Sequence, residues 1–207
     1  MSAMLRRGLR RRAPAEVRDD PPVGRTQYYT AATLDGFIAD PEDSLDWLFT
    51  RNREEDGLLN YRDFIADVGA LAMGATTYEW ILDHEFAGKD PAEWRWPYEI
   101  PCWVFTHRRL AVVSGAPITF TSEDVAAVHA EMAAAAGGRN VWLVGGGDLV
   151  GQFSDAGLLD EVLVSIAPVT LGAGKPLLPR RLELRLDEVG RNGDFVSARF
   201  SVVRAPA

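Results

Sequence analysis

Three consecutive glycines, Gly145–Gly147, separate an apolar segment from a segment with helical spacing. Val141–Val144 is continuously apolar, which is typical of a buried strand, and Asp148–Phe153 favours a helix. Glycines allow a ligand to approach the backbone, and a helix N-terminus offers unpaired N–H groups and the positive end of the helix dipole. This arrangement suits a diphosphate group. A tight turn without a ligand is the alternative, and the glycine spacing differs from the Rossmann fingerprint.

A second glycine turn repeats this architecture earlier in the chain. Gly74 ends the apolar run Ala70–Met73, and Ala75, Thr76 and Thr77 lead into another predicted helix. Because both turns follow predicted strands, their helix N-termini can hold one extended dinucleotide between them.

A third predicted strand end carries hydroxyl and cationic groups. Cys102–Thr106 reads as a strand, and His107, Arg108 and Arg109 follow it directly. Arginine binds a phosphate monoester with two parallel hydrogen bonds, so this segment suits a terminal phosphate. Ordinary surface charge is the alternative interpretation.

The elements that must position these groups alternate between strands and helices. The predicted strands are a segment starting at Gln27, then Ala70–Met73, Cys102–Thr106, Ile118–Phe120, Val141–Val144, Glu161–Pro168 and Phe195–Val203. The predicted helices are about Gly57–Val68, Tyr78–Leu82, a helix capped by Thr121 or Ser122 and ending at Ala136, and Leu149–Ala156. This order predicts an α/β domain with a mostly parallel central sheet, helices on both faces and an antiparallel C-terminal edge.

Composition narrows the class of protein. The net charge of −8 disfavours nucleic acid as a partner, and no apolar run approaches the ~20 residues of a membrane helix. The one cysteine, Cys102, fits a buried apolar position and a cytoplasmic protein. His84 and His129 have no accompanying ligand set, so no metal is expected. The arginine-rich residues 1–24 are interpreted as a disordered extension, and 25–207 as one domain.

In this order, the three motifs and the opening segment Thr30–Ile38 resemble the dihydrofolate-reductase-like superfamily over Gln27–Val203. The ending, Gly157–Leu178, looks like the branch that contains the riboflavin-biosynthesis reductase C-terminal domain and its stand-alone relatives. The resemblance implies a three-layer fold, a cis peptide between Gly145 and Gly146, and often a homodimer. It also implies NADPH as cofactor, with NADH possible, and a small-molecule substrate.

The resemblance carries a cofactor site over to named positions of this chain. These are Ala31, Ile38, Gly74, Ala75, Thr76, Thr77, Thr106, His107, Arg108, Gly145, Gly146, Gly147, Asp148, Leu149 and Gln152. Three positions depart from the family pattern. Ala75 and Asp148 stand where related proteins often have a basic residue, which weakens the choice of NADPH over NADH. Val144 replaces a glutamate of riboflavin-type reductases, which disfavours a riboflavin-pathway substrate.

Two carboxylates are candidate catalytic groups. Asp35 lies on the loop that should border the nicotinamide and the substrate, although a turn-forming role beside Gly36 explains it equally well. Folate reductases need a carboxylate near the position of Asn60, and Asp56 is the choice among its neighbours Glu55 and Asp63. A solvated helix face is the alternative for these three acids. Three tryptophans are further candidates for lining a planar substrate, namely Trp47, Trp94 and Trp96.

The expected function is hydride transfer from a reduced nicotinamide to a small planar heterocycle, pterin- or pyrimidine-like, or to a carbonyl compound. Two alternatives stay open. One is a true dihydrofolate reductase, and the other is a non-catalytic nucleotide-binding protein on the same fold.

Overall fold

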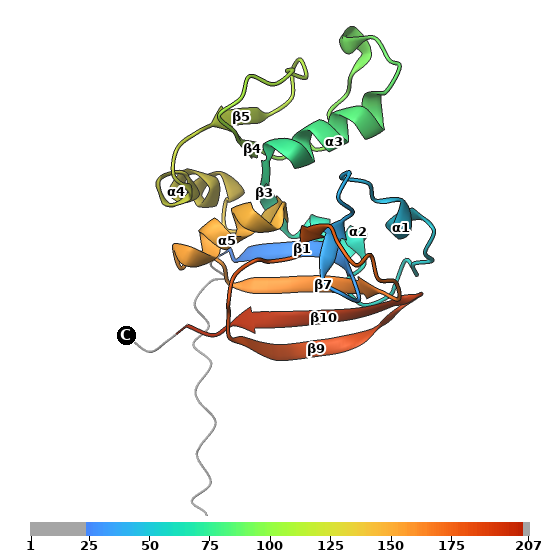
Figure 1. The fold of residues 1–207 in the computed structure, drawn as a ribbon. Coiled ribbons are helices and arrows are strands. Elements are labelled where there is room, and N and C mark those ends of the chain that lie inside the picture. The colour runs from blue at the N-terminus through green and yellow to red at the C-terminus, as the bar shows by residue number, and fades with distance from the viewer. Residues whose placement is uncertain (1–23, 205–207) are drawn as a thin grey trace, which may run out of the picture.

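The computed structural model of the protein describes residues 24–204 (Figure 1). Residues 1–23 and 205–207 lie outside the described part, and nearly all of the expected N-terminal extension, 1–24, falls among them.

An eight-stranded sheet forms the centre of the fold, in the order β5-β4-β3-β6-β1-β7-β10-β9 (Figure 1). The strands are β1 (Thr26–Thr33), β3 (Val68–Gly74), β4 (Cys102–Phe105), β5 (Ile118–Thr121), β6 (Asn140–Gly145), β7 (Glu161–Ala167), β9 (Leu184–Asn192) and β10 (Phe195–Val202). The pairs from β5 to β7 are parallel, and β10 is antiparallel to both β7 and β9. The predicted mostly parallel sheet with an antiparallel C-terminal edge is confirmed.

Apolar side chains cover both faces of this sheet because its central strands are apolar at successive positions. The helices are α1 (Asp46–Phe49), α2 (Tyr61–Ala66), α3 (Ala75–Phe86), the 3-10 turn η1 (Pro91–Glu93), α4 (Val125–Ala136) and α5 (Gly147–Asp155). Ala70 and Ala72 of β3 face a core that includes Met132 of α4 and Phe153 of α5. The alternate residues of β3 face a second core that includes α3.

Several predicted boundaries are wrong for local reasons. The helix expected over Gly57–Val68 shortens to α2, because Leu59 has a φ of +58° and Val68 already pairs in the sheet. Asn60, where a folate reductase would need an acid, instead caps α2 by accepting a hydrogen bond from the Asp63 N–H at 2.9 Å. Asp124, rather than Thr121 or Ser122, caps α4.

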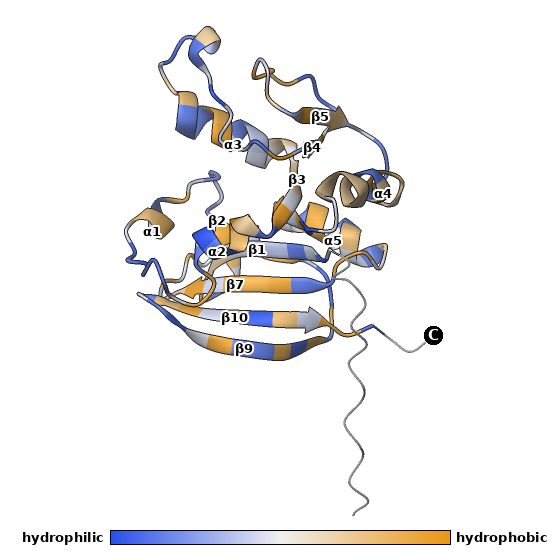
Figure 2. Cartoon of the chain, turned by 180° about the vertical axis from the view of Figure 1, so that it is seen from behind, coloured by the Kyte–Doolittle hydropathy of each residue, from blue (hydrophilic) through white to orange (hydrophobic). Residues whose placement is uncertain are grey.

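The other helices differ mainly in length. α3 begins at Ala75 and reaches Phe86, well beyond the expected Tyr78–Leu82. Strand β9 was not expected at all. Figure 2 shows polar and apolar residues alternating along it, and Leu186 and Val189 are exposed. Among residues 24–204, no helix combines the length and the apolar character that crossing a membrane requires.

A two-stranded ribbon outside the main sheet joins β2 (Phe37–Ala39) to β8 (Lys175–Pro176). Ala39 pairs with Lys175, and the Leu177 N–H donates to the Gly36 carbonyl at 2.9 Å. Gly174 permits this approach. Its φ is +155°, and a Cβ there would lie 2.2 Å from the Ala39 carbonyl oxygen.

We therefore expect Gly174→Ala to cost at least about 3 kcal/mol of unfolding free energy, because it adds a steric overlap to an unfavourable backbone conformation. Gly172→Ala is the matched control, since Gly172 also has a positive φ, +74°, but faces open space. Its cost should be about 1 kcal/mol. Urea unfolding of both variants measures the difference, and equal losses would contradict the assigned packing of the ribbon.

Candidate cofactor and substrate site

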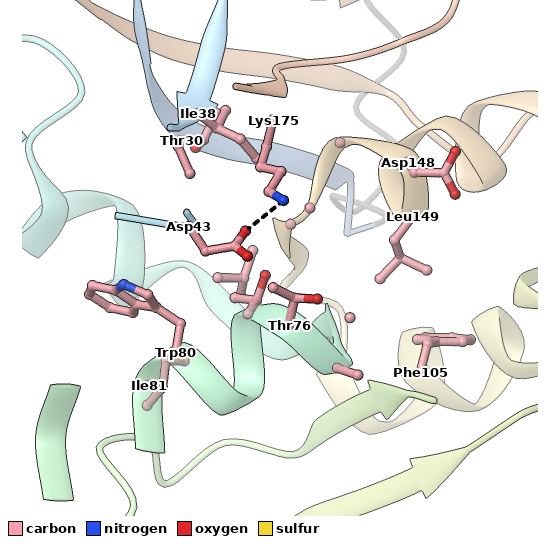
Figure 3. Close-up of a pocket in the computed structure, with 18 of the residues that line it drawn as sticks. Thr30, Ile38, Asp43, Thr76, Trp80, Ile81, Phe105, Asp148, Leu149 and Lys175 are labelled. Atoms are coloured by element: carbon pink, nitrogen blue, oxygen red, sulfur yellow. Dashed lines mark ion pairs between the residues drawn. The ribbon is translucent and has the colours of Figure 1, made fainter. Parts of the chain in front are cut away.

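A cavity of about 690 Å³ lies at the carboxyl ends of β3, β4, β5 and β6, beside the middle of β1 (Figure 3). Such a crevice is where ligands bind in open parallel sheets. Every residue predicted to bind the cofactor lines it, except Arg108. The three segments singled out in the sequence therefore meet at one place.

The triple glycine turn contributes backbone rather than side chains to this cavity. A cis peptide joins Gly145 and Gly146, as the resemblance implied. Gly146 precedes α5 and gives the helix no side-chain cap. A Cβ on Gly146 would have Ile38 Cδ1 as its nearest neighbour at 3.9 Å, so this position leaves room beside the cavity. A Cβ on Gly147 would instead lie 2.4 Å from the carbonyl oxygens of Pro176 and Leu177.

The second helix N-terminus faces the same cavity. Gly74 precedes α3 without a side-chain cap, and the first turn of α3 carries no acidic residue. Ala75, Thr76 and Thr77 of that turn all line the cavity. Two uncapped helix N-termini therefore offer N–H groups to one space, which is the electrostatic environment an anionic diphosphate requires.

Asp148 would oppose an anion in the first turn of α5, but its carboxylate is engaged elsewhere. Arg180 Nη2 lies 3.2 Å from Asp148 Oδ1, and the Arg180 Nε donates to Asp155 at 2.9 Å. Gln152 Nε2 donates to the other Asp148 oxygen at 3.2 Å. The hydrogen bond with Asp155, and after it the contact with Asp148, raise the pKa of Arg180. A cation outside the cavity thus compensates the charge of Asp148.

The predicted terminal phosphate site is only partly present. Thr106 and His107 line the cavity, and Thr106 Oγ1 accepts a hydrogen bond from the Arg108 N–H at 2.9 Å. The Arg108 guanidinium turns to Glu79 of α3 and donates two hydrogen bonds, at 3.1 and 2.7 Å. The Glu79 carboxylate therefore competes with a phosphate for the Arg108 guanidinium.

Asp35 has the surroundings of a turn residue. Thr33 Oγ1 donates to its carboxylate at 2.5 Å, and the Gly172 N–H donates at 2.7 Å. The Leu171 N–H also donates, at 3.0 Å. These bonds, that from Thr33 first, lower the pKa of Asp35. Asp35 does not line the cavity, and its carboxylate fastens the β1–β2 turn to residues 171–172.

Asp56 and its neighbours do not supply a helix carboxylate either. Asp56 is exposed, and neither it nor Glu55 or Asp63 lines the cavity. The carboxylates that do line it, among the described residues, are Asp43, Glu123 and Asp148. The tryptophans that line the cavity also differ from those expected. Trp47, Trp94 and Trp96 lie outside the lining, whereas Trp80 and Trp142 belong to it.

The side of the cavity next to the β2–β8 ribbon contains residues that the sequence did not predict. Figure 3 shows Asp43 and Lys175 on the same side as Thr30 and Ile38, with Asp148, Leu149 and Phe105 on the other. Lys175 Nζ lies 3.4 Å from Asp43 Oδ1. Five aromatic residues also line the cavity, namely Tyr29, Tyr61, Trp80, Tyr98 and Trp142. The glycines flanking Ala173 indicate a turn just before Lys175, and this was the available sequence signal for that residue. The aromatic residues come from separate segments, and no shared motif connects them.

Two of these phenols have a raised pKa, and both are neutral at neutral pH, as an unperturbed tyrosine also is. Desolvation raises the pKa of Tyr61 and, more strongly, that of Tyr98. Both side chains therefore present a protonated hydroxyl and an apolar ring at neutral pH, which suits a flat ligand with polar edges. Among the described residues, no group of three metal-binding side chains comes together.

Comparison with known proteins agrees with this geometry. The family described as the RibD C-terminal domain matches residues 26–194. An uncharacterised protein of Bacillus subtilis, YwjB, is 31% identical in an alignment of 188 positions, which covers 85% of this chain and 97% of that protein. A second uncharacterised Bacillus subtilis protein, YyaP, is 26% identical and is covered to 82% of its length, against 75% of this chain.

Solved structures share the architecture at low sequence identity. A putative riboflavin biosynthesis protein from Shewanella has a TM-score of 0.67 and 22% identity, over 87% of this chain and 99% of that chain. Dihydrofolate reductase from Enterococcus faecalis, solved with NADP(H), has a TM-score of 0.51 and 12% identity, over 87% of this chain and 97% of its own. A pyrimidine reductase-like protein from Corynebacterium diphtheriae has a TM-score of 0.58 and 13% identity, over 88% and 93%. Together these matches show that the chain belongs to the RibD C-terminal domain family and has the dihydrofolate-reductase-like fold.

Proposed function

We propose that the protein is an NADPH-dependent oxidoreductase that transfers hydride to a small planar heterocycle, pterin- or pyrimidine-like, or to a carbonyl compound. The observation that carries the proposal is the pair of uncapped helix N-termini, α3 and α5, that open onto one cavity. The name of the pyrimidine reductase-like relative and the NADP(H) bound to the folate reductase support the same reading.

The residues present fit a dinucleotide. Gly74 and Gly146 lack side chains where the cavity meets the helix N-termini, and a Cβ on either would have no neighbour closer than 3.9 Å. These two turns would hold the diphosphate. Thr106 and His107 would lie toward the terminal phosphate, and Ala31 and Ile38 toward the nicotinamide. When bound, the reduced nicotinamide supplies a hydride.

The remaining cavity residues would bind and orient the substrate. The aromatic rings of Tyr61, Trp80 and Tyr98 offer flat contact surface and exclude water. A true dihydrofolate reductase is less favoured, because no carboxylate on or beside α2 lines the cavity. The expected homodimer and cytoplasmic location stay predictions.

The direct test is titration of the protein with NADPH and NADH, followed by nicotinamide fluorescence. We expect saturable binding of NADPH, and oxidation of NADPH with at least one compound from a panel of pterins, flavin precursors and quinones. Binding without turnover would favour the non-catalytic alternative. Absence of binding for both cofactors would refute the proposed function.

Gly146→Val should abolish NADPH binding while the protein stays folded. The position has room for a side chain within the fold, but that side chain would fill space beside the helix N-terminus. Circular dichroism reports folding, and fluorescence titration reports binding. Gly147→Ala is the contrasting variant, since its Cβ meets backbone oxygens at 2.4 Å and should lower the melting temperature. A folded Gly146→Val variant with unchanged NADPH affinity would move the cofactor elsewhere.

Arg108→Glu combined with Arg109→Glu should weaken NADPH far more than NADH, because only NADPH carries the additional phosphate. Since Glu79 competes for Arg108, Glu79→Gln should strengthen NADPH binding and leave NADH unchanged. One charge-assisted hydrogen bond corresponds to roughly 10-fold or more in the dissociation constant. Equal changes for both cofactors would place the phosphate away from Arg108.

A further inference from the structure

We propose that Lys175 binds and polarises a carbonyl oxygen of the substrate, and that Asp43 positions its ammonium group. This inference rests on the proposed reductase function and narrows its substrates to planar compounds with a carbonyl at the reacting end. Lysine is rare in this chain. Of 22 cationic Lys and Arg residues, two are lysines, Lys89 and Lys175, and Lys175 alone of these lines the cavity.

The fold holds the backbone of Lys175 in place from both sides. Lys175 pairs with Ala39 across the ribbon, and Gly174 allows that contact because a side chain would overlap the Ala39 carbonyl. On the other side, Gly147 packs against the backbone of Pro176 and Leu177. Lys175 therefore sits on a short strand fixed to both the β1–β2 turn and the glycine turn, as a preorganised functional group requires.

Asp43 is also held in a specific conformation. Asp40 Oδ1 accepts hydrogen bonds from the Ser44 N–H at 2.7 Å and the Glu42 N–H at 2.9 Å. The resulting turn gives Asp43 a φ of +65°, which is uncommon for residues other than glycine and easiest for Asp and Asn. This turn brings the Asp43 carboxylate into the cavity next to Lys175 (Figure 3).

The pair leaves the ammonium group available to a ligand. The 3.4 Å between Lys175 Nζ and Asp43 Oδ1 is longer than a good charge-assisted hydrogen bond, and both side chains are partly exposed, at 45% and 39%. An ammonium group has three donors, so one contact with Asp43 leaves others for a substrate oxygen. Arg53, the other long cationic side chain in the lining, lies over the Phe195 ring at 4.6 Å from its centre.

Lysine also suits the chemistry better than arginine. When hydride reaches an unsaturated carbon of a carbonyl compound, the displaced π electrons move onto the oxygen. The Lys175 ammonium stabilises this charge and donates a proton to the oxygen, and water then returns a proton to the amine. A guanidinium cannot give up its proton in this way, whereas an ammonium can.

The activity test uses three planar carbonyl compounds, isatin, lumazine and 1,4-naphthoquinone, with NADPH as reductant. Wild-type protein should oxidise NADPH with at least one of them. For that compound, Lys175→Met should lower kcat/KM about 100-fold, and Lys175→Arg should recover part of the loss by restoring the charge. Asp43→Asn keeps the turn conformation and should cost roughly 10-fold, mainly in kcat, by releasing the ammonium group.

Controls separate this role from cofactor binding and from structure. All variants should bind NADPH within about twofold of wild type, and Lys89→Met, whose side chain lies outside the cavity, should have unchanged activity. If Lys175→Met loses NADPH affinity as much as turnover, Lys175 serves the cofactor and the inference is wrong. If NADPH binds but none of the three compounds is reduced, the inference also fails while the cofactor site stands. If NADPH does not bind, the proposed function itself fails.

A second readout does not depend on turnover. Reductive methylation with ¹³C-formaldehyde labels both lysines, and a Lys89→Arg variant assigns their NMR signals. The Lys175 signal should move on addition of the carbonyl compound that is reduced, and not on addition of its carbonyl-free parent, indole, pteridine or naphthalene. A Lys175 signal that responds to neither, or equally to both, would overturn the assigned contact.

Discussion

Gly147 packs so closely against the end of β8 that a methyl group on it would meet the carbonyl oxygens of Pro176 and Leu177 at 2.4 Å. This contact joins the two halves of the cavity. On one side it fixes the start of α5, whose N–H groups face the proposed diphosphate position. On the other it fixes the β2–β8 ribbon, which Tyr28 also holds by donating from its hydroxyl to the Leu177 carbonyl at 3.1 Å. The relative position of the proposed cofactor and substrate sites therefore depends on a glycine without a functional group.

Ion pairs in the fold change the effect that two charged residues were expected to have on a bound anion. Asp148, at a helix N-terminus, would repel an anion in the cavity. Arg108, beside the predicted phosphate position, would attract it. In the fold each is paired, Asp148 with Arg180 and Arg108 with Glu79. Exposed pairs of this kind contribute little to stability, because solvent screens them. Their consequence here is that neither charge acts on the cavity at full strength, which leaves the N-terminal dipoles of α3 and α5 less opposed there.

The sequence predicted the parts of the site that depend on backbone pattern. Glycines after apolar runs indicated both helix N-termini. The two termini face one cavity because the carboxyl ends of parallel strands lie at the same edge of a sheet. It did not predict that Asp43, Lys175 and Trp142 line the same cavity, since this depends on a ribbon and on packing between distant segments. Asp35, for which catalysis and turn formation were equally good interpretations, has the surroundings of a turn residue. An acid on the expected loop was available for catalysis, but the N–H groups of Leu171 and Gly172 take its oxygens, and local sequence contains no sign of that partner.

Strand β9 ends the sheet, and no described residue pairs with its outer edge. A free edge presents unpaired N–H and carbonyl groups to any extended chain. The exposed side chains of Leu186 and Val189 add apolar surface that such a chain could bury. Charged residues alternate with them along the strand, at Arg185, Asp187, Glu188 and Arg191. An incoming strand would have to desolvate or match these charges at every register, so uncontrolled stacking into fibrils is disfavoured. The charges on β9 thus act against unwanted strand pairing at the antiparallel edge of the sheet.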